Sequence, residues 1–569
     1  MPVGATGFGA ADWLEFFFAF VLILSAFIWT PALQRLLASF ATRTRLAMLA
    51  LFLTPIALRL ALLPNHPVPM PNVYDEFSHL LMADTLLHLR LANPPHPMHP
   101  FFETFFVLQQ PAYSSIYPLG QGLILAFGRL ISGLPWTGVL CATGAMCALS
   151  YWMLRAYVPP LWALLGGVLA VIQFGPLNLW MNCYWGGALP AAAGCLVFGA
   201  LPRLSDAWRR GVTARKRDAA LLGVGFGLHL LTRPFESILL AMSIVLFCLL
   251  LPFHRDVWRP VLRSALIALT AFSPALFLTL LQNKQVTGTW ATLPEQLSQF
   301  QYGVPTTLTI QKPAMPHVPL TPQQTLEYKA QFLMHGPDTD TLARFVLRLE
   351  YRVRDYRFFF LPPLYLAAAV SIIALRQKLY IWVAATLVIF GLGTNLFPYL
   401  LVHYLAAVTC LVLLVAVTGV RQIKRLNIHG FPAGTDIARI LVLLCGAEFL
   451  LWYSIHLFEN HHAPLALLQY ETWDAVNHRN PKKRVAAALD IAAQRGQLLI
   501  FVHYSPQHIF QDEWVWNSAD IDASRVVFAR DLGLRKDTEL IRYYPSRRVL
   551  WFEPDADPPA LSSTAPAAE

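Results

Sequence analysis

The sequence predicts an all-α polytopic membrane protein with about 12 or 13 transmembrane helices, followed by a small soluble α/β domain at the C-terminus. Of the 569 residues, 56% are hydrophobic and only 13% are charged, which is about half the charged fraction of soluble domains. Long apolar segments recur up to residue 457, and charge rises beyond it. Most Lys and Arg lie in short loops or in the C-terminal region, so membrane topology accounts for much of the net charge of +10, and no nucleic-acid partner is expected.

The first segments set the predicted orientation. Residues 1–44 contain an apolar span at about 14–29 and a basic loop with Arg35, Arg43 and Arg45, and a second span follows at about 46–63. The positive-inside rule places this loop in the cytoplasm, so the N-terminus and the loop of residues 64–117 are expected outside. No cleavable signal peptide is expected, because no positively charged region precedes the first span.

The remaining apolar segments complete a membrane domain at residues 45–457. They lie at about 119–133, 137–153, 160–177, 185–202, 219–233, 235–252, 264–282, 358–375, 379–395, 398–418 and 437–457. The basic loops assign sides that are consistent for these segments except at residues 119–133, where the number of crossings is off by one. Either this segment does not cross fully or one loop is assigned to the wrong side, and we favour a short re-entrant or shallow helix. A second, Pro-rich loop at 282–357 is expected outside.

The C-terminal region changes character. Residues 458–555 are expected to form the soluble α/β domain, with a helix near 485–493 and strands near 497–502, 525–528 and 547–552. The Pro- and Ala-rich residues 556–569 are expected to be a disordered tail. The seven cysteines fall in or beside apolar segments without zinc or Cys-x-x-Cys spacing, so they predict neither a disulfide framework nor a metal site.

Two adjacent carboxylates in the first long loop are the main functional signal. Asp75 and Glu76 follow the end of an apolar segment. Carboxylates beside a membrane are costly unless they are solvated or used, so we predict that both are catalytic. The alternative is that they only begin a surface helix that is capped by Asn72. Apolar residues after them recur at helical spacing and predict an amphipathic helix lying on the membrane.

Polar and aromatic residues elsewhere are predicted to lie on the same outer face. A carboxylate base together with arginines suits transfer from a phosphate-linked donor. The candidate substrate-binding residues are Tyr74, His79, Gln110, Tyr117, Tyr184, Trp185, Arg233, Arg352, Arg354, His403 and Tyr404. The alternatives are interfacial anchoring for Arg352 and Arg354, an aromatic belt for Tyr184 and Trp185, and a buried structural histidine for His403.

Several kinds of cofactor site are missing from the sequence. It contains no Walker motif, dinucleotide-binding Gly-rich loop, Ser-hydrolase elbow or His-Glu-x-x-His, so a nucleotide is not the expected donor. Asp520 and Asp522 are expected to form a turn rather than a metal site. No cofactor is certain, and no metal ligand is assigned. A divalent metal held by Asp75, Glu76 and His79 is left open.

Three short motifs resemble those of GT-C fold glycosyltransferases. These polytopic enzymes use polyprenyl-phosphate sugars and include the protein O-mannosyltransferases and the aminoarabinose transferases of lipid A. Tyr74-Asp75-Glu76 resembles their first-loop acidic motif, Tyr117-Pro118 their second motif, and His403-Tyr404 a His-Tyr pair entering a late helix. The resemblance covers residues 45–457 as architecture.

The resemblance implies that Asp75 is a general base with Glu76 as its neighbour, and that Arg352 and Arg354 lie near the donor phosphate. The chain departs from the pattern by an extra N-terminal span. It also lacks, at Ser115 and Ile116, the basic residue that the family often has just before the second motif.

The sequence therefore predicts an inverting glycosyltransferase of the inner (cytoplasmic) membrane. It would move a sugar from a polyprenyl phosphate to a lipid, glycan or protein acceptor on the outer side, with Asp75 as base. Inversion follows from one base without an evident nucleophile. The rivals are a transporter or flippase of a lipid-linked glycan, and a non-catalytic envelope assembly protein in which changes at Asp75 would be harmless.

Overall fold

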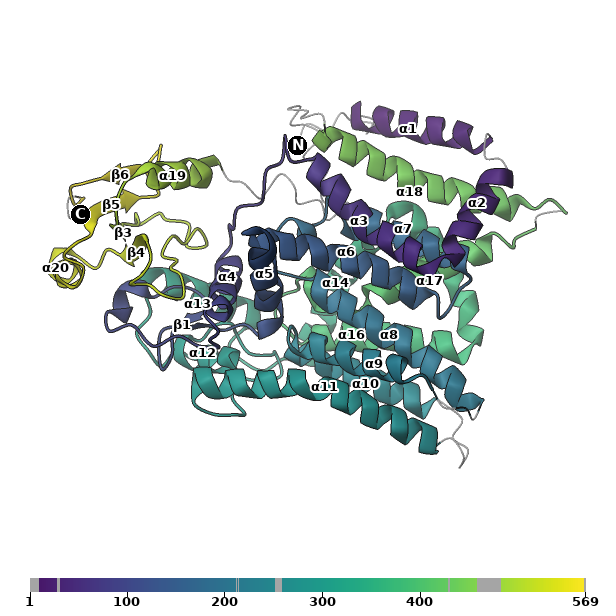
Figure 1. Cartoon of the computed structure of the whole chain (residues 1–569), viewed down its shortest axis with the longest axis horizontal. Coiled ribbons are helices and arrows are strands. Elements are labelled where there is room, and N and C mark those ends of the chain that lie inside the picture. Colours follow the sequence, from purple (N-terminus) through teal and green to yellow (C-terminus); the bar gives the residue numbers. More distant parts are fainter. Residues whose placement is uncertain are drawn as a thin grey trace.

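The computed structural model describes residues 10–27, 31–210, 212, 214–250, 258–427, 430–457 and 482–566. A large helical bundle carries a small mixed domain beside one end, where the C-terminus lies (Figure 1). We call this end of the bundle, with α4 (Tyr74–Leu87), α12 (Pro294–Tyr302) and α13 (Pro322–His335), the loop face.

Six segments in the described ranges are long and apolar enough to cross a membrane. They are α3 (Thr44–Ala61), α6 (Pro135–Leu154), α8 (Ala188–Arg209), α11 (Trp258–Thr287), α18 (Ala433–Leu457) and Val402–Ile423, which ends in α17 (Thr409–Ile423). Five shorter apolar segments accompany them: α5 (Leu119–Ser132), α7 (Pro160–Phe174), α10 (Pro234–Leu249), α16 (Lys378–Thr394) and Pro362–Arg376, which contains α15 (Tyr365–Val370). The predicted fold class, a helical multi-pass membrane protein with a C-terminal α/β domain, is confirmed.

Small residues let the helices of the bundle approach closely. A Cβ atom at Gly194 on α8 would lie 2.0 Å from the carbonyl oxygen of Ala407, and one at Gly223 on α9 (Lys216–Leu230) would lie 2.0 Å from that of Ala268 on α11. Close backbone contact at small residues is typical of helix packing in membranes. The N-terminal α1 (Ala10–Phe27) packs on α18, and α2 (Pro31–Thr42) packs on α7.

Helix α5 does not cross the bundle. At its start, the backbone N–H of Gly120 donates to the carbonyl of Leu231 (2.6 Å), in the turn between α9 and α10. Just after its end, Trp136 at the start of α6 lies under the guanidinium of Arg59, at the loop-face end of α3 (4.8 Å). Its 14 residues span about 21 Å, less than the ~30 Å of a bilayer core. The shallow or re-entrant placement of this helix in the membrane stays a prediction.

Helix α4 differs from its prediction. The sequence predicted an amphipathic helix on the membrane surface, but Leu81, Met82, Ala83, Asp84 and Thr85 are all buried, so that prediction is wrong. The helix packs against α5 and the short hairpin of β1 (Val107–Leu108) and β2 (Ser114–Ser115). The burial arises from tertiary contacts with distant segments, which periodicity does not show.

The second loop is largely helical. Helices α12 and α13 both begin with Pro at the first helical position, where the missing N–H costs nothing. The hydroxyl of Thr321 caps α13 by accepting the N–H of Gln324 (3.2 Å). Helix α14 (Leu342–Tyr356) follows and leads back into the bundle.

The C-terminal domain contains α19 (Lys482–Ala493), β3 (Leu498–Val502), β4 (Val526–Arg530), α20 (Leu534–Tyr543), β5 (Arg548–Glu553) and β6 (Ala560–Ser562). The sheet order is β4-β3-β5-β6, with β4, β3 and β5 parallel and β6 antiparallel to β5. Strand β3 is central and fully buried, as parallel strands generally are. Residues 560–562 were predicted to lie in a disordered tail, and their pairing with β5 corrects that. The predicted start of the domain, 458–481, lies outside the described residues.

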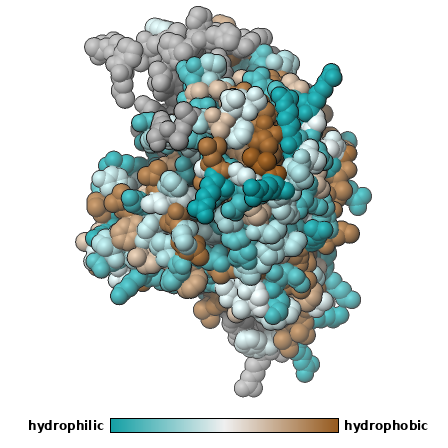
Figure 2. Space-filling view, turned by 90° about the vertical axis from the view of Figure 1, so that its left-hand side faces the viewer, coloured by the Kyte–Doolittle hydropathy of each residue, from teal (hydrophilic) through white to brown (hydrophobic). Residues whose placement is uncertain are grey.

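The C-terminal domain docks on α4. The carboxylate of Asp84 accepts the backbone N–H of Ala519 (2.8 Å) and pairs with Arg129 on α5 (2.7 Å). The ring of Phe77 stacks on Trp516, with centroids 4.7 Å apart. Figure 2 faces this side of the molecule and shows hydrophilic residues interspersed with small apolar groups. The domain therefore contacts the same helix that carries Asp75.

Candidate functional site

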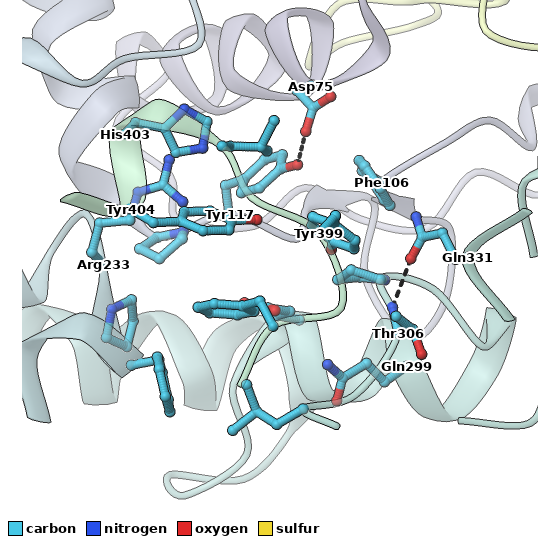
Figure 3. Close-up of a pocket in the computed structure, with 18 of the residues that line it drawn as sticks. Asp75, Phe106, Tyr117, Arg233, Gln299, Thr306, Gln331, Tyr399, His403 and Tyr404 are labelled. Carbon is cyan, nitrogen blue, oxygen red and sulfur yellow. Dashed lines mark hydrogen bonds between the residues drawn. The ribbon is translucent and has the colours of Figure 1, made fainter. Parts of the chain in front are cut away.

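A cavity of ≈ 480 Å³ lies at the loop face (Figure 3). Its walls come from the first turn of α4, the segment after β2, the α9–α10 turn, α12, α13 and residues 397–404. Seven of the predicted site residues line it: Tyr74, Asp75, Tyr117, Trp185, Arg233, His403 and Tyr404. The cavity thus gathers residues that lie more than 300 positions apart in the sequence.

Asp75 presents a buried carboxylate to this cavity. The hydroxyl of Tyr117 donates a hydrogen bond to its Oδ1 (Figure 3). Burial raises the pKa of Asp75 to about 7; the carboxylates of Glu327 and Glu76 add to the rise, and the Tyr117 hydrogen bond opposes it. A carboxylate with a pKa near neutrality suits a general base.

Glu76 has different contacts from its neighbour. Its Oε2 accepts the backbone N–H groups of Asn72 (2.9 Å) and Val73 (3.1 Å), and its Oε1 accepts that of Tyr184 (2.9 Å). The helix cap is Val73 rather than the predicted Asn72, and Glu76 occupies the third helical position, from which it reaches back to the chain before the helix. Glu76 does not line the cavity, and its contacts are those of a residue that fixes the start of α4.

Arg233 brings a positive charge to another wall of the cavity. It immediately precedes α10, and its guanidinium lies over the ring of Tyr404 at 5.5 Å (Figure 3). Within the described part of the chain, no ion pair to Arg233 is found. His403 contacts the ring of Trp185 with centroids 5.0 Å apart. The cation and these rings form the part of the cavity away from Asp75.

The two arginines predicted to lie near a phosphate do not line the cavity. Arg352 donates to the carbonyls of Thr394 and Phe397, both at 2.6 Å, and so holds the chain just before the cavity segment 397–404. Arg354 is exposed and lies 5.8 Å from the ring of its neighbour Tyr351. One arginine therefore supports the cavity wall, and the other faces away from it.

Three further predicted residues also lie outside this cavity. The hydroxyl of Tyr184 donates to the carbonyl of Pro69 (2.8 Å), and Gln110 lines a second cavity beside the C-terminal domain. The ring of His79 stacks on the ring of Tyr117, with centroids 4.2 Å apart. Burial, together with Arg233, lowers the pKa of His79 to about 3, so its ring is neutral. Among the described residues, no three His, Cys, Asp or Glu side chains are grouped as a metal site.

The structure adds residues that the sequence did not single out. Glu295, Glu327, Gln331 and Tyr399 line the cavity from α12, α13 and the segment before His403. The hydroxyl of Tyr74 donates to Glu327 (3.0 Å), which Gln331 also contacts. The only signal in the sequence was the polar character of the second loop, because nothing local pairs residues that lie 253 positions apart.

Comparisons with known proteins give similarity in structure. No protein-family model and no curated protein match the sequence. ArnT from Cupriavidus metallidurans bound to undecaprenyl phosphate aligns with a TM-score of 0.49 at 10% identity, over 89% of this chain and 92% of that chain. The apo state of the same protein aligns with a TM-score of 0.47 at 12% identity, with the same coverage of both chains.

A third structure is the archaeal oligosaccharyltransferase AglB from Archaeoglobus fulgidus, in complex with an inhibitory peptide and a dolichol-phosphate. It aligns with a TM-score of 0.42 at 10% identity, over 81% of this chain and 62% of that chain. These alignments all have TM-scores below 0.5 at identities of 10–12%.

Proposed function

We propose that this chain is an integral membrane glycosyltransferase that transfers a sugar from a polyprenyl-phosphate donor to an acceptor in the cell envelope. One observation carries the proposal: the Asp75 carboxylate and the Arg233 guanidinium face the same cavity at the loop face of a membrane bundle. A base and a cation in one cavity suit displacement of a phosphate from a sugar.

The residues divide the reaction between them. Asp75 accepts the proton of the acceptor hydroxyl as its oxygen attacks the anomeric carbon of the donor sugar. The bond between that carbon and the phosphate oxygen breaks, and the polyprenyl phosphate departs with the bonding electrons. Arg233 stabilises the departing phosphate by charge and hydrogen bonding. A single displacement of this kind inverts the anomeric carbon.

The cavity rim suits a donor with a long lipid tail. Ile238 on α10 and Met334 on α13 line the cavity, and both side chains are 58% exposed. Helix α10 is one of the shorter apolar helices of the bundle. The polyprenyl chain of the donor lies beside these apolar side chains, while the phosphate and the sugar enter the polar interior of the cavity.

The proposal places the cavity and the C-terminal domain on the outer side of the inner membrane. The opposite end of the bundle carries the basic loops: Arg155 there contacts Thr44 at the start of α3 (3.1 Å), next to Arg43 and Arg45. Short loops rich in Arg and Lys remain in the cytoplasm. The loop face is then on the side where polyprenyl-linked sugars meet envelope acceptors.

A transfer assay tests the function. Wild type, Asp75→Asn and the control Asp338→Asn, an exposed acid of the second loop, are reconstituted and supplied with a panel of polyprenyl-phosphate sugars and crude envelope acceptors. We expect transfer by wild type and the control, and a loss of about 10²–10⁴-fold in Asp75→Asn. Movement of a lipid-linked sugar across the bilayer without transfer would instead establish a transporter.

The same assay decides the role of a divalent ion. Activity that is lost with chelator and restored by a divalent metal would add the ion to the reaction. Activity that is indifferent to chelator would leave Asp75 and Arg233 as the charged groups that act on the substrates.

A further inference from the structure

A second cavity of ≈ 850 Å³ lies between the C-terminal domain and both long loops. Its walls include the residues that follow β3 and β4, His503 and Asp531, and the start of α20. In open α/β sheets, ligands bind beyond the carboxyl ends of parallel strands. The volume falls within the range of small-molecule sites.

Two residues that line this cavity each leave one buried polar atom without an N–H donor or an acceptor in the described part of the chain. Asp537 is 1% exposed, and its Oδ1 accepts the N–H of Leu532 (3.0 Å). Its carboxyl group lies beside that of Asp531, but no N–H donor reaches its Oδ2. The indole N–H of Trp551 is likewise buried without an acceptor. Buried polar groups are nearly always satisfied, so an acceptor and a donor left open in one cavity point to a ligand that offers both.

The charges in the cavity disfavour an anionic ligand. Glu103, Asp531 and Asp537 bring three carboxyl groups to it. The two backbone N–H groups just before α20 are already bound to acids, because Asp531 accepts the N–H of Gly533 (2.9 Å) and Asp537 that of Leu532. Arg530 is paired with Glu513 and also donates to Gln323. Lys536 also lines the cavity, but the three carboxyl groups outnumber these two cations, so an anionic ligand is disfavoured.

The remaining lining fits hydroxyl groups and sugar rings. Amide side chains come from Gln110 and Gln323, and aromatic rings from Tyr302, Tyr504 and Trp551. Hydroxyl groups donate to carboxylates and accept from an indole N–H, while the apolar face of a sugar ring packs on aromatic rings. A fatty acyl chain would leave these polar groups unsatisfied.

We propose that this second cavity binds an uncharged oligosaccharide, the saccharide part of the acceptor. The assignment of this oligosaccharide as part of the acceptor rests on the proposed function. Helices α12 and α13 wall both cavities: Gln299 and Glu327 face the first, and Tyr302 and Gln323 the second. An extended acceptor is therefore held by the C-terminal domain while its reacting hydroxyl reaches Asp75, and that domain selects glycan acceptors.

Direct binding tests the site. The full-length protein in nanodiscs is titrated with maltotetraose, mannotetraose, chitotetraose and an acidic tetragalacturonate. Asp537→Asn keeps an oxygen for the N–H of Leu532, and Trp551→Phe keeps the ring stacked on Phe501. We expect an uncharged tetrasaccharide to bind in preference to the acidic one, and each variant to weaken it by at least about tenfold. Asp490→Asn, which changes an exposed acid of the same domain, should bind as wild type does.

The outcomes separate this site from the proposed function. No binding of any uncharged tetrasaccharide at millimolar concentration, preference for the acidic one, or binding that is insensitive to both cavity variants would overturn the site. Sugar transfer without such binding would overturn the site and leave the transferase. Saccharide binding by a protein that transfers nothing would overturn the transferase and the acceptor assignment, while the saccharide site would stand.

Discussion

Two adjacent acids at the start of α4 have opposite surroundings. Successive helical positions point about 100° apart, so neighbouring side chains face different partners. Glu76, at the third position, accepts three backbone N–H groups. Asp75, one position earlier, faces the cavity and receives only the Tyr117 hydroxyl as a side-chain partner in the described residues. Asp75 is therefore the one free to act as a base.

The two acids should respond differently to neutralisation. Glu76→Gln removes the charge and one of the two acceptor oxygens, so backbone N–H groups lose their acceptor at a cost of about 1–3 kcal/mol. Asp75→Asn removes a carboxylate whose burial is unfavourable, so stability should be unchanged or higher at pH 8. Thermal unfolding in detergent at pH 8 measures both. An equal fall in melting temperature for the two variants would contradict this division of roles.

The pH dependence of transfer should follow Asp75. The base acts only when ionised, and its pKa is raised to about 7, so kcat/KM should fall as the pH drops through about 7. The Tyr117 hydrogen bond lowers this pKa. Tyr117→Phe should therefore move the acidic limb to higher pH, which a kcat/KM profile from pH 5 to 9 resolves. A limb that stays in place, or moves to lower pH, would exclude Asp75 as the titrating base.

At the scale of elements, the cavity depends on short segments that longer helices hold in place. Residues 397–404 carry Tyr399, His403 and Tyr404 into the cavity. Arg352 on α14 fixes the chain just before them through two carbonyls. Burial lowers the pKa of Arg352 to about 10, and its guanidinium remains charged at neutral pH. Helix α14 thus connects the second loop to the site without touching its interior.

Arg352 and Arg354 offer a matched pair of tests. Arg352→Ala frees two carbonyls and lets the cavity segment shift, and displacement of a site by about 1 Å costs up to about 10²-fold in rate. We expect kcat to fall by this order, with no specific loss of affinity for donor phosphate. Arg354→Ala, which removes an exposed arginine two positions along, should be near wild type. Steady-state kinetics with varied donor decide it, because a rise in donor KM alone would indicate direct phosphate contact.

At the scale of the whole molecule, local patterns predicted the helical class and three of the strands of the C-terminal domain. Hydropathy located the spans, and short β-branched runs located β3, β4 and β5 within about two residues. The site could be predicted only in part. Asp75, Tyr117 and Arg233 stood out by residue type, but Glu295 and Glu327 did not, because only tertiary packing brings α12 and α13 to α4.

The docking of the C-terminal domain was also beyond local patterns. Asp84 joins α4, α5 and the backbone of Ala519 across 435 positions in the sequence. The amphipathic surface helix was predicted from apolar residues at helical spacing, which implied that the polar residues between them faced water. They are instead partners of the C-terminal domain and of neighbouring loops, which makes that domain part of the framework around the site.

The orientation of the molecule is the last prediction. Leu89, which is 96% exposed, and Asp338 lie in the two long loops, whereas Arg210 and Arg425 lie in exposed basic loops at the other end of the bundle. In a Cys141→Ser, Cys248→Ser background, which removes the two partly exposed native thiols, each of these residues is replaced by Cys. A membrane-impermeant maleimide applied to intact cells, or to spheroplasts where an outer membrane is present, should label Leu89→Cys and Asp338→Cys at once, and Arg210→Cys and Arg425→Cys only after lysis. The reverse pattern would place Asp75 on the cytoplasmic side and contradict transfer at the outer face, since the basic loops would then lie outside against the positive-inside rule.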